Sequence, residues 1–504
     1  MKTMKMALMA GAAVAVSAAA AHADELSDLK AQVESLNARM AAMETAPSVP
    51  TGYQLLAISK GEAAQIPGML GSDRDRVIDK SATVISVMPT ADAPAGTTIS
   101  WSGYVRAAVV YAGHQGNATL KLTYTDPDGK TSPQEFTLNK GKENEVTYTD
   151  GKIKYSNLSD DDWDVRARGQ LKVVATTDTA VGEVGVELKM RADFNGNGSG
   201  DAYMKTAWGY WAMTPELTFG GGYSGSLGNI GYGYDGACTC YYTDNADLGF
   251  DPGDTTQLRL SYASGPFSMA VALEDSGLNN GFGNDNSYYN GNNLGVAGEL
   301  KYSGDAFSGE ISGVYRTVNA DDYTQSIGSG VYKANIDSLW QVGAGVGFNL
   351  GDIASISLAA ALGSGPYNEV NSSGTIIDSY PVQNDWWGVT GLASANLSDS
   401  VHAEVGAGYK HRETDSHDFL SSPLDNADSW KSSGIDYNTW GILGGVYYTP
   451  VDQLTIGLEG EWYTKEAKQS VKNTTSGSES SGYKWSLDAS TDNWTVDLVS
   501  VWRF

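Results

Sequence analysis

The stretch WTVDLVSVWRF, residues 494–504, alternates apolar and polar residues. Every second residue belongs to one set: Phe504, Trp502, Ser500, Leu498 and Val496. The residues between them include Arg503 and Asp497, so the other set is mixed in polarity. Successive side chains of a β-strand point to opposite faces. The stretch therefore predicts a strand with one mostly apolar face and one mixed face, lying between two different media.

Other segments repeat this alternation with more charge. In residues 185–194 one face holds Val186, Leu188, Met190, Ala192 and Phe194, and the other holds Glu187, Lys189, Arg191 and Asp193. Residues 164–173 and 454–462 follow the same pattern. A soluble core would not accept so charged a face, because buried charges need partners. We therefore expect these faces to line a wet interior.

From residue 98 onward the alternating segments are separated by breaks of two lengths. Short turns lie at residues 177–182, 214–216, 263–266, 303–306, 350–353, 397–400 and 449–453. Long polar breaks lie near residues 112–162, 195–202, 227–254, 276–293, 320–337, 363–384, 415–434 and 464–493. Seven short turns alternating with eight long breaks predict sixteen strands. We expect an all-β fold, a 16-stranded antiparallel transmembrane β-barrel over residues 98–504, because an even strand number lets the sheet close in lipid.

The composition excludes two other classes of protein. No stretch after residue 23 approaches the roughly 18 consecutive apolar residues of a spanning helix, which excludes a helical membrane protein. The net charge of -27 excludes nucleic-acid binding through backbone phosphates.

The first 97 residues precede the expected barrel. Residues 1–23 resemble a signal peptide, in which Lys2 and Lys5 precede an apolar run that ends in Ala-His-Ala. Residues 24–46 carry apolar positions at alternating gaps of three and four: Leu26, Leu29, Val33, Leu36, Met40 and Met43. This pattern predicts a short periplasmic coiled-coil helix that joins two or three chains, or else an amphipathic helix on the protein's own surface. Residues 47–97 are expected to form a periplasmic linker of uncertain, partly helical structure.

The terminal strand, SGYVRAAVVY (102–111) and VYYTPVDQLTIGLEGEWY (446–463) together resemble the alphaproteobacterial trimeric porin family. The resemblance covers roughly residues 98–504. It implies a homotrimeric outer-membrane channel for passive diffusion of small hydrophilic solutes, with no cofactor. It also implies that Phe504, with Trp502, is read by the barrel-assembly machinery. Outer-membrane lipid and lipopolysaccharide are expected partners, peptidoglycan is a further candidate, and nucleic acid is not expected.

The resemblance also implies where the pore narrows, because the third outer loop of that family folds inward. The matching stretch, residues 228–254, contains only acidic charges: Asp235, Asp244, Asp247, Asp251 and Asp254. Inward positions of the early strands would form a basic wall opposite: Arg106, Arg166, Arg168, Lys172, Lys189, Arg191, Lys205 and Arg259. Facing rows of opposite charge orient dipolar solutes. The alternatives are a solvated outer loop and a wall whose cations pair with lumen acids such as Glu187 and Asp193.

The same charges bear on ion selectivity. The net charge and four acidic lumen positions, Glu310, Glu404, Glu459 and Glu461, favour a weak cation preference, which the basic wall opposes. A substrate-specific channel for sugars or anions is one alternative. A structural or adhesive barrel that does not conduct is another.

Few residues suggest other chemistry. Cys238 and Cys240 lie one residue apart, which favours a local disulfide or free thiols over a Cys-x-Cys metal site. Residues 193–201 resemble the start of a calcium loop, but Met204 stands where the bidentate Glu should be, so no metal is predicted. No serine lies in a nucleophile motif beside a histidine, so no catalytic residue is assigned and an enzyme is not expected.

Overall fold

The structure is a computed structural model, and it describes part of the chain. The described residues are 55–61, 82–88, 97–125, 130–138, 144–148, 151–155, 159–195, 200–243, 246–275, 294–317, 324–327, 330–333, 338–369, 380–414, 417–420, 429–474 and 482–504. The predicted signal peptide, residues 1–23, and the predicted coiled coil, residues 24–46, lie outside them. Within the described residues, no helix has the length and apolar character needed to cross a membrane.

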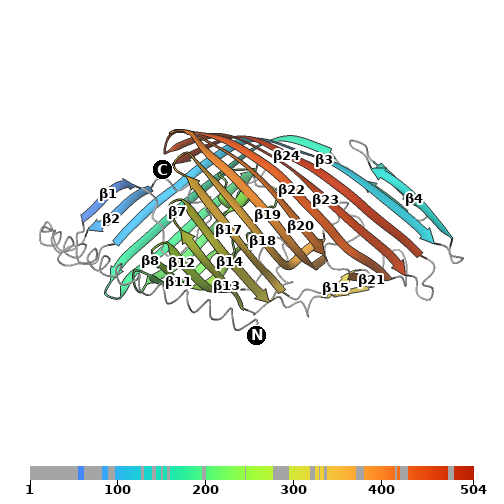
Figure 1. Cartoon of the computed structure of the whole chain (residues 1–504), viewed down its shortest axis with the longest axis horizontal. Coiled ribbons are helices and arrows are strands. Elements are labelled where there is room, and N and C mark those ends of the chain that lie inside the picture. Colours follow the sequence, from blue (N-terminus) through green and yellow to red (C-terminus); the bar gives the residue numbers. More distant parts are fainter. Residues whose placement is uncertain are drawn as a thin grey trace.

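Sixteen antiparallel strands form a closed barrel (Figure 1). In chain order they are β3 (Thr97–Thr125), β7 (Ser159–Thr179), β8 (Gly182–Asn195), β9 (Ala202–Ala212), β10 (Leu217–Gly225), β11 (Asp254–Ser264), β12 (Phe267–Asp275), β13 (Leu294–Ser303), β14 (Phe307–Thr317), β17 (Ser338–Leu350), β18 (Ala354–Glu369), β19 (Tyr380–Ser398), β20 (Val401–Thr414), β22 (Ser429–Val451), β23 (Leu454–Thr474) and β24 (Gly482–Arg503). Each strand pairs with the next, and β24 pairs back with β3, where Arg503 lies opposite Tyr104. The predicted 16-stranded barrel is confirmed.

The predicted alternation of short turns and long connections is also confirmed. All seven short turns join consecutive barrel strands. In the turn after β7, Gly182 has a φ of +115°, which favours glycine, and the Thr179 hydroxyl donates to its carbonyl oxygen at 2.5 Å. The long connections carry the remaining elements: β4 (Thr131–Leu138), β5 (Asn144–Tyr148), β6 (Gly151–Tyr155), α3 (Gly233–Ala237), β15 (Thr324–Ile327), β16 (Gly330–Lys333) and β21 (His417–Leu420).

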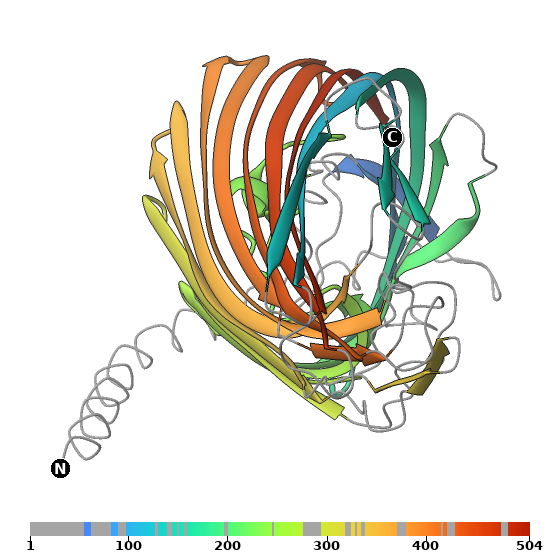
Figure 2. The same ribbon diagram turned by 90° about the vertical axis from the view of Figure 1, so that its right-hand side faces the viewer.

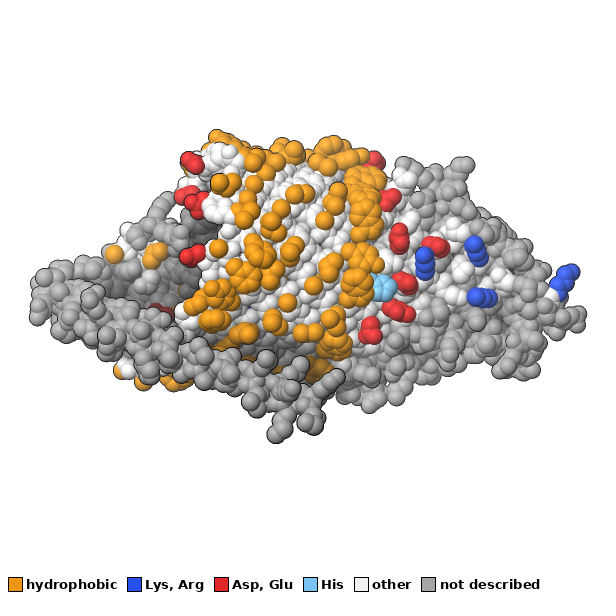
Figure 3. Space-filling model, viewed as in Figure 1, with side chains coloured by type: hydrophobic (Ala, Val, Ile, Leu, Met, Phe, Trp, Pro, Cys, Tyr) orange, Lys and Arg blue, Asp and Glu red, His pale blue; other side chains and the backbone are white. Residues whose placement is uncertain are grey.

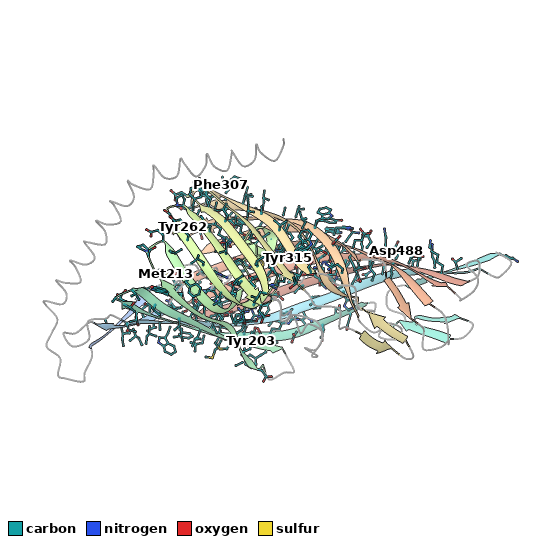
Figure 4. The ribbon with its side chains drawn as sticks, turned by 90° about the horizontal axis from the view of Figure 1, so that it is seen from below. Tyr203, Met213, Tyr262, Phe307, Tyr315 and Asp488 are labelled. Atoms are coloured by element: carbon teal, nitrogen blue, oxygen red, sulfur yellow. A yellow bond between two sulfur atoms is a disulfide. The ribbon has the colours of Figure 1, made fainter. Side chains whose placement is uncertain are left out.

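The two faces of the wall differ in polarity as the alternation predicts. On β8, Val186 and Leu188 are each 46% exposed, whereas Glu187 and Lys189 are each 3% exposed. On the face shown in Figure 3, apolar side chains are spread over the barrel wall, and acidic and basic side chains lie beyond them towards the ends of the strands. Aromatic side chains such as Tyr262 project away from the wall (Figure 4). The apolar face therefore meets lipid, and the charged face turns inward.

Two further strands belong to the predicted linker, residues 47–97. Strand β1 (Leu55–Gly61) pairs with β2 (Ala82–Met88), and β2 pairs with the start of β3, where Thr83 lies opposite Trp101. The described parts of this segment are therefore strands, and its partly helical structure stays a prediction because residues 62–81 and 89–96 lie outside the described residues. The two strands extend the barrel sheet at the end where the short turns lie, next to the end of β24.

Candidate functional site

Residues 226–253, called the inner loop below, connect β10 to β11 and fold into the barrel. Helix α3, drawn in green, lies within the ring of strands (Figure 2). Its Tyr234 packs with Leu248 against Leu392 of β19 and Leu443 of β22. An inward glycine of β17 makes room for the loop, because a Cβ at Gly345 would lie 2.5 Å from the Cβ of Tyr232. The inward third loop implied by the resemblance is present.

Wall carboxylates on β20 and β23 hold the backbone of the inner loop. Glu459 accepts the N–H of Tyr241 at 2.8 Å and the N–H of Tyr242 at 3.0 Å. Glu461 accepts the N–H of Ala246 at 3.2 Å and also the hydroxyl of Tyr234. Glu404 accepts the N–H of Thr239 at 3.0 Å. These bonds satisfy buried backbone donors that the loop does not pair with its own carbonyls.

The two ends of the inner loop are held by Glu274 of β12 and Arg316 of β14. Glu274 accepts the Ser226 hydroxyl at 2.8 Å and the N–H of Leu227 at 3.1 Å. Arg316 forms a 2.7 Å ion pair with Glu274 and donates to the carbonyl of Pro252 at 3.1 Å. Both charged side chains are almost fully buried, so the pair is shielded from water.

These contacts change the interpretation of the acidic lumen positions. We took Glu310, Glu404, Glu459 and Glu461 as charges that attract cations in the open lumen. Glu310 instead accepts the N–H of Gly231 at 2.6 Å, and the others bind the loop as described above. All four residues are buried. Sequence could show that they face inward, but not that the loop would cover them.

The acidic residues of the inner loop are dispersed. Asp244 lies outside the described residues, and Asp235 is half-buried in α3. The Asp251 carboxylate accepts the N–H of Gly253 at 2.9 Å. Asp254, at the start of β11, forms an ion pair with Lys205 of β9. This ion pair joins the predicted acidic loop to the predicted basic wall.

Asp247 is one of the exposed acids of the inner loop. Its side chain is 60% exposed and forms an ion pair with Arg412 of β20. Desolvation inside the barrel raises the pKa of Asp247, but the positive charges of Lys410 and Arg412 outweigh it and hold the pKa below its ordinary value. Lys410 also donates to the carbonyl of Gly249 at 3.0 Å. The sequence analysis missed Lys410 and Arg412, although their spacing around His411 places both on the inward face.

Three arginines of the predicted basic wall, on β7 and β8, are half-buried. Arg166 pairs with Asp164 at 2.8 Å, and Arg168 pairs with Asp193. Arg191 donates to Gln170 at 2.9 Å. The cations here have partners within the wall, which is the arrangement that we named as the alternative.

Four further members of the predicted basic wall are buried. Lys172 and Lys189 lie 3.6 and 3.8 Å from the carboxylate of Glu187. Arg259 lies over the Trp208 ring, 5.0 Å from its centroid. Arg106 lies 4.3 Å from the ring centroid of Tyr242 and so contacts the inner loop through an aromatic face.

A pocket at the long-loop end of the wall is lined by residues of four neighbouring strands, β7, β3, β24 and β23. Asp160 and Asp162 come from β7, His114 from β3, and Asn493 from β24. His114 lies opposite both Asp160 and Asn493 in the sheet. The pocket gathers acidic groups that the sequence analysis did not select, because they lie within a predicted long loop.

The two cysteines form a disulfide with each other in the inner loop. Both are buried, and their sulfur atoms lie beside the Glu404 carboxylate. The local disulfide, which we favoured over a metal site, is therefore the state of this structure.

Residues 95–489 match the model of a family described as a porin subfamily. No curated protein matches the chain. OmpT of Vibrio cholerae is 12% identical, with a TM-score of 0.43 over 81% of this chain and 98% of its own. The anion-selective porin of Comamonas acidovorans is 11% identical, with a TM-score of 0.40 over 81% and 100% of the two chains. A mutant Rhodopseudomonas blastica porin is 12% identical, with a TM-score of 0.37 over 81% and 100%.

Proposed function

This chain belongs to the porin subfamily and forms a diffusion channel in the bacterial outer membrane. We propose that the inner loop narrows the passage of this channel. The loop is bonded to β12, β14, β20 and β23, which leaves the inner faces of β7 and β8 opposite it. On our proposal, solutes pass between the loop and these two strands. The family and the fold indicate a channel rather than an enzyme.

We propose that the channel has a weak cation preference, although the basis differs from the one expected. The observation that carries this proposal is that Arg166 and Arg168 are each paired with a wall carboxylate, Asp164 and Asp193. Local pairing weakens the field that these arginines project into the passage. Asp160 and Asp162 line the pocket at the long-loop end of the wall. Together with the net charge of -27, they favour the entry of cations over anions.

Self-association as a homotrimer is part of the same proposal. It is supported by the heptad pattern of residues 24–46 and by the family resemblance. Binding of lipopolysaccharide, the barrel-assembly machinery or peptidoglycan stays a prediction. Chemical cross-linking in detergent, beside a variant that lacks residues 24–46, tests both the oligomer and the contribution of the coil.

The selectivity proposal is tested by the reversal potential in a salt gradient. We expect the wild type to prefer cations and the variant Asp160→Asn/Asp162→Asn to lose a few-fold of that preference. The matched control is Asp488→Asn, which removes an exposed acid on the outer side of β24. A wild type that prefers anions, or a pocket variant that behaves like the control, would sink the selectivity proposal and leave the channel itself intact.

A further inference from the structure

We infer that the inner loop holds a site for a soft divalent cation such as Zn²⁺, formed by Cys238, Cys240 and Glu404 when the disulfide is reduced. Two residues come from the loop and one from β20, so the site joins the loop to the barrel wall. It lies outside the passage proposed above, and the inference does not depend on ion selectivity.

The three side chains already have the spacing of a metal site. The two sulfur atoms and a carboxylate oxygen of Glu404 all lie within 4.8 Å of one another. Tetrahedral zinc, with bonds of about 2.3 Å to sulfur and about 2.0 Å to oxygen, sets its ligand atoms roughly 3.5–4 Å apart. Small side-chain rotations therefore suffice. All three residues are buried, which removes competing water.

His402 lies next to Glu404, at the edge of this group. Its Nδ1 lies 3.1 Å from Oδ1 of Asn396. Its Nε2 lies 3.6 Å from the Glu404 carboxylate. His402 therefore borders the carboxylate of the proposed site, whose ligands are Cys238, Cys240 and Glu404.

The disulfide itself is a poor candidate for a staple of the fold. It links residues two positions apart, so it closes a very short loop and constrains the unfolded chain little. It does hold a turn in which the N–H groups of Thr239 and Cys240 both point to Glu404, at 3.0 and 3.4 Å. The thiols and the amides thus converge on one carboxylate.

Zinc binding requires that an external reductant first reduce the disulfide. A phosphine transfers two electrons to the disulfide and becomes the phosphine oxide, while water supplies the oxygen atom and two protons, giving two thiols. Zn²⁺ then replaces the two thiol protons, which leave to solvent, and two Zn–S bonds form. A carboxylate beside two thiolates is unfavourable without a cation, and the metal compensates this charge.

The test is zinc binding to the full-length protein in detergent, measured by metal content after desalting. We expect one Zn²⁺ per chain for wild type folded with a phosphine, and none for oxidised wild type or for Cys238→Ser/Cys240→Ser. Glu404→Gln should weaken binding at least tenfold. Co²⁺ in place of Zn²⁺ should show a thiolate-to-metal absorption band only in the reduced wild type. Far-UV circular dichroism checks that each sample keeps its β-structure.

Four results would overturn the inference. One is equal zinc content in oxidised and reduced wild type, and another is no zinc in reduced wild type. The third is loss of the barrel signal on reduction, which would make the disulfide structural. An unchanged affinity in Glu404→Gln would remove the wall from the site and count against it as well.

Discussion

The carboxylate of Glu459, on β23, accepts the backbone N–H of Tyr241, 218 residues earlier in the chain, at 2.8 Å. The next N–H, of Tyr242, donates to the other oxygen of the same carboxylate. Glu459 is 1% exposed, so these bonds are made away from bulk water, where an unsatisfied partner is costly. The position of the inner loop therefore depends on buried glutamates of the wall.

Replacing Glu459 with Gln should loosen the inner loop. An amide nitrogen would then face a backbone N–H, and we expect a loss of about 1–3 kcal/mol in the free energy of unfolding. Single-channel current should also fluctuate more than in the wild type. The control is Glu466→Gln, on the same strand but exposed. Quiet, wild-type current in Glu459→Gln would show that the loop does not rely on this carboxylate.

Removing Arg316 should be more damaging, because it leaves Glu274 as a buried charge without its cation. We expect Arg316→Met to cost about 3–5 kcal/mol in urea unfolding from lipid vesicles. The double variant with Glu274→Met should lose less than the sum of the two single losses, since the uncompensated charge is gone. Additive losses would mean that the 2.7 Å pair contributes no coupling.

Changing Arg168 to Gln should raise the preference for cations. The substitution removes the positive partner of Asp193 on the wall opposite the inner loop. We expect the reversal potential in a salt gradient to move towards cations, by a few-fold in the permeability ratio. Arg259→Gln serves as the contrast, because Arg259 is buried at 1% exposure and should affect stability more than selectivity. A shift towards anions in Arg168→Gln would contradict the proposed passage.

A charge on the outward face should destabilise the barrel in lipid. The side chain of Leu458 is 56% exposed. Leu458 lies on β23 midway between Leu454, where the strand begins, and the outward-facing Trp462. Leu458→Arg should cost about 2–4 kcal/mol in vesicles. Glu466→Arg, further along the same face, should be nearly neutral. An equal cost at both positions would place the lipid band elsewhere.

Much of the fold could be predicted from sequence because strand alternation is local. The sides taken by Val186 and Glu187 follow from a period of two, and the seven short turns follow from local turn chemistry. Strands β1 and β2, in the segment before β3, were not predicted. They are short, and the pairing of β2 with β3 depends on where β24 ends, which sequence does not place.

The site could be predicted only in part, since its contacts join distant residues. Sequence identified the inner loop and the inward face of Glu459, but not that the two meet. It also could not show that Arg168 lies opposite Asp193 in the sheet, because that pairing depends on register. Arg412 was missed because its partner Asp247 comes from a loop whose path is set by the whole barrel.

The central claim is that this barrel conducts through a passage bounded by the inner loop. The most direct test is planar-bilayer recording of purified wild-type protein beside the Glu459→Gln variant. We predict stepwise ion current in the wild type, in groups of three if the chain forms a trimer, and a noisier current in the variant. A folded, inserted wild type that never conducts would contradict the account.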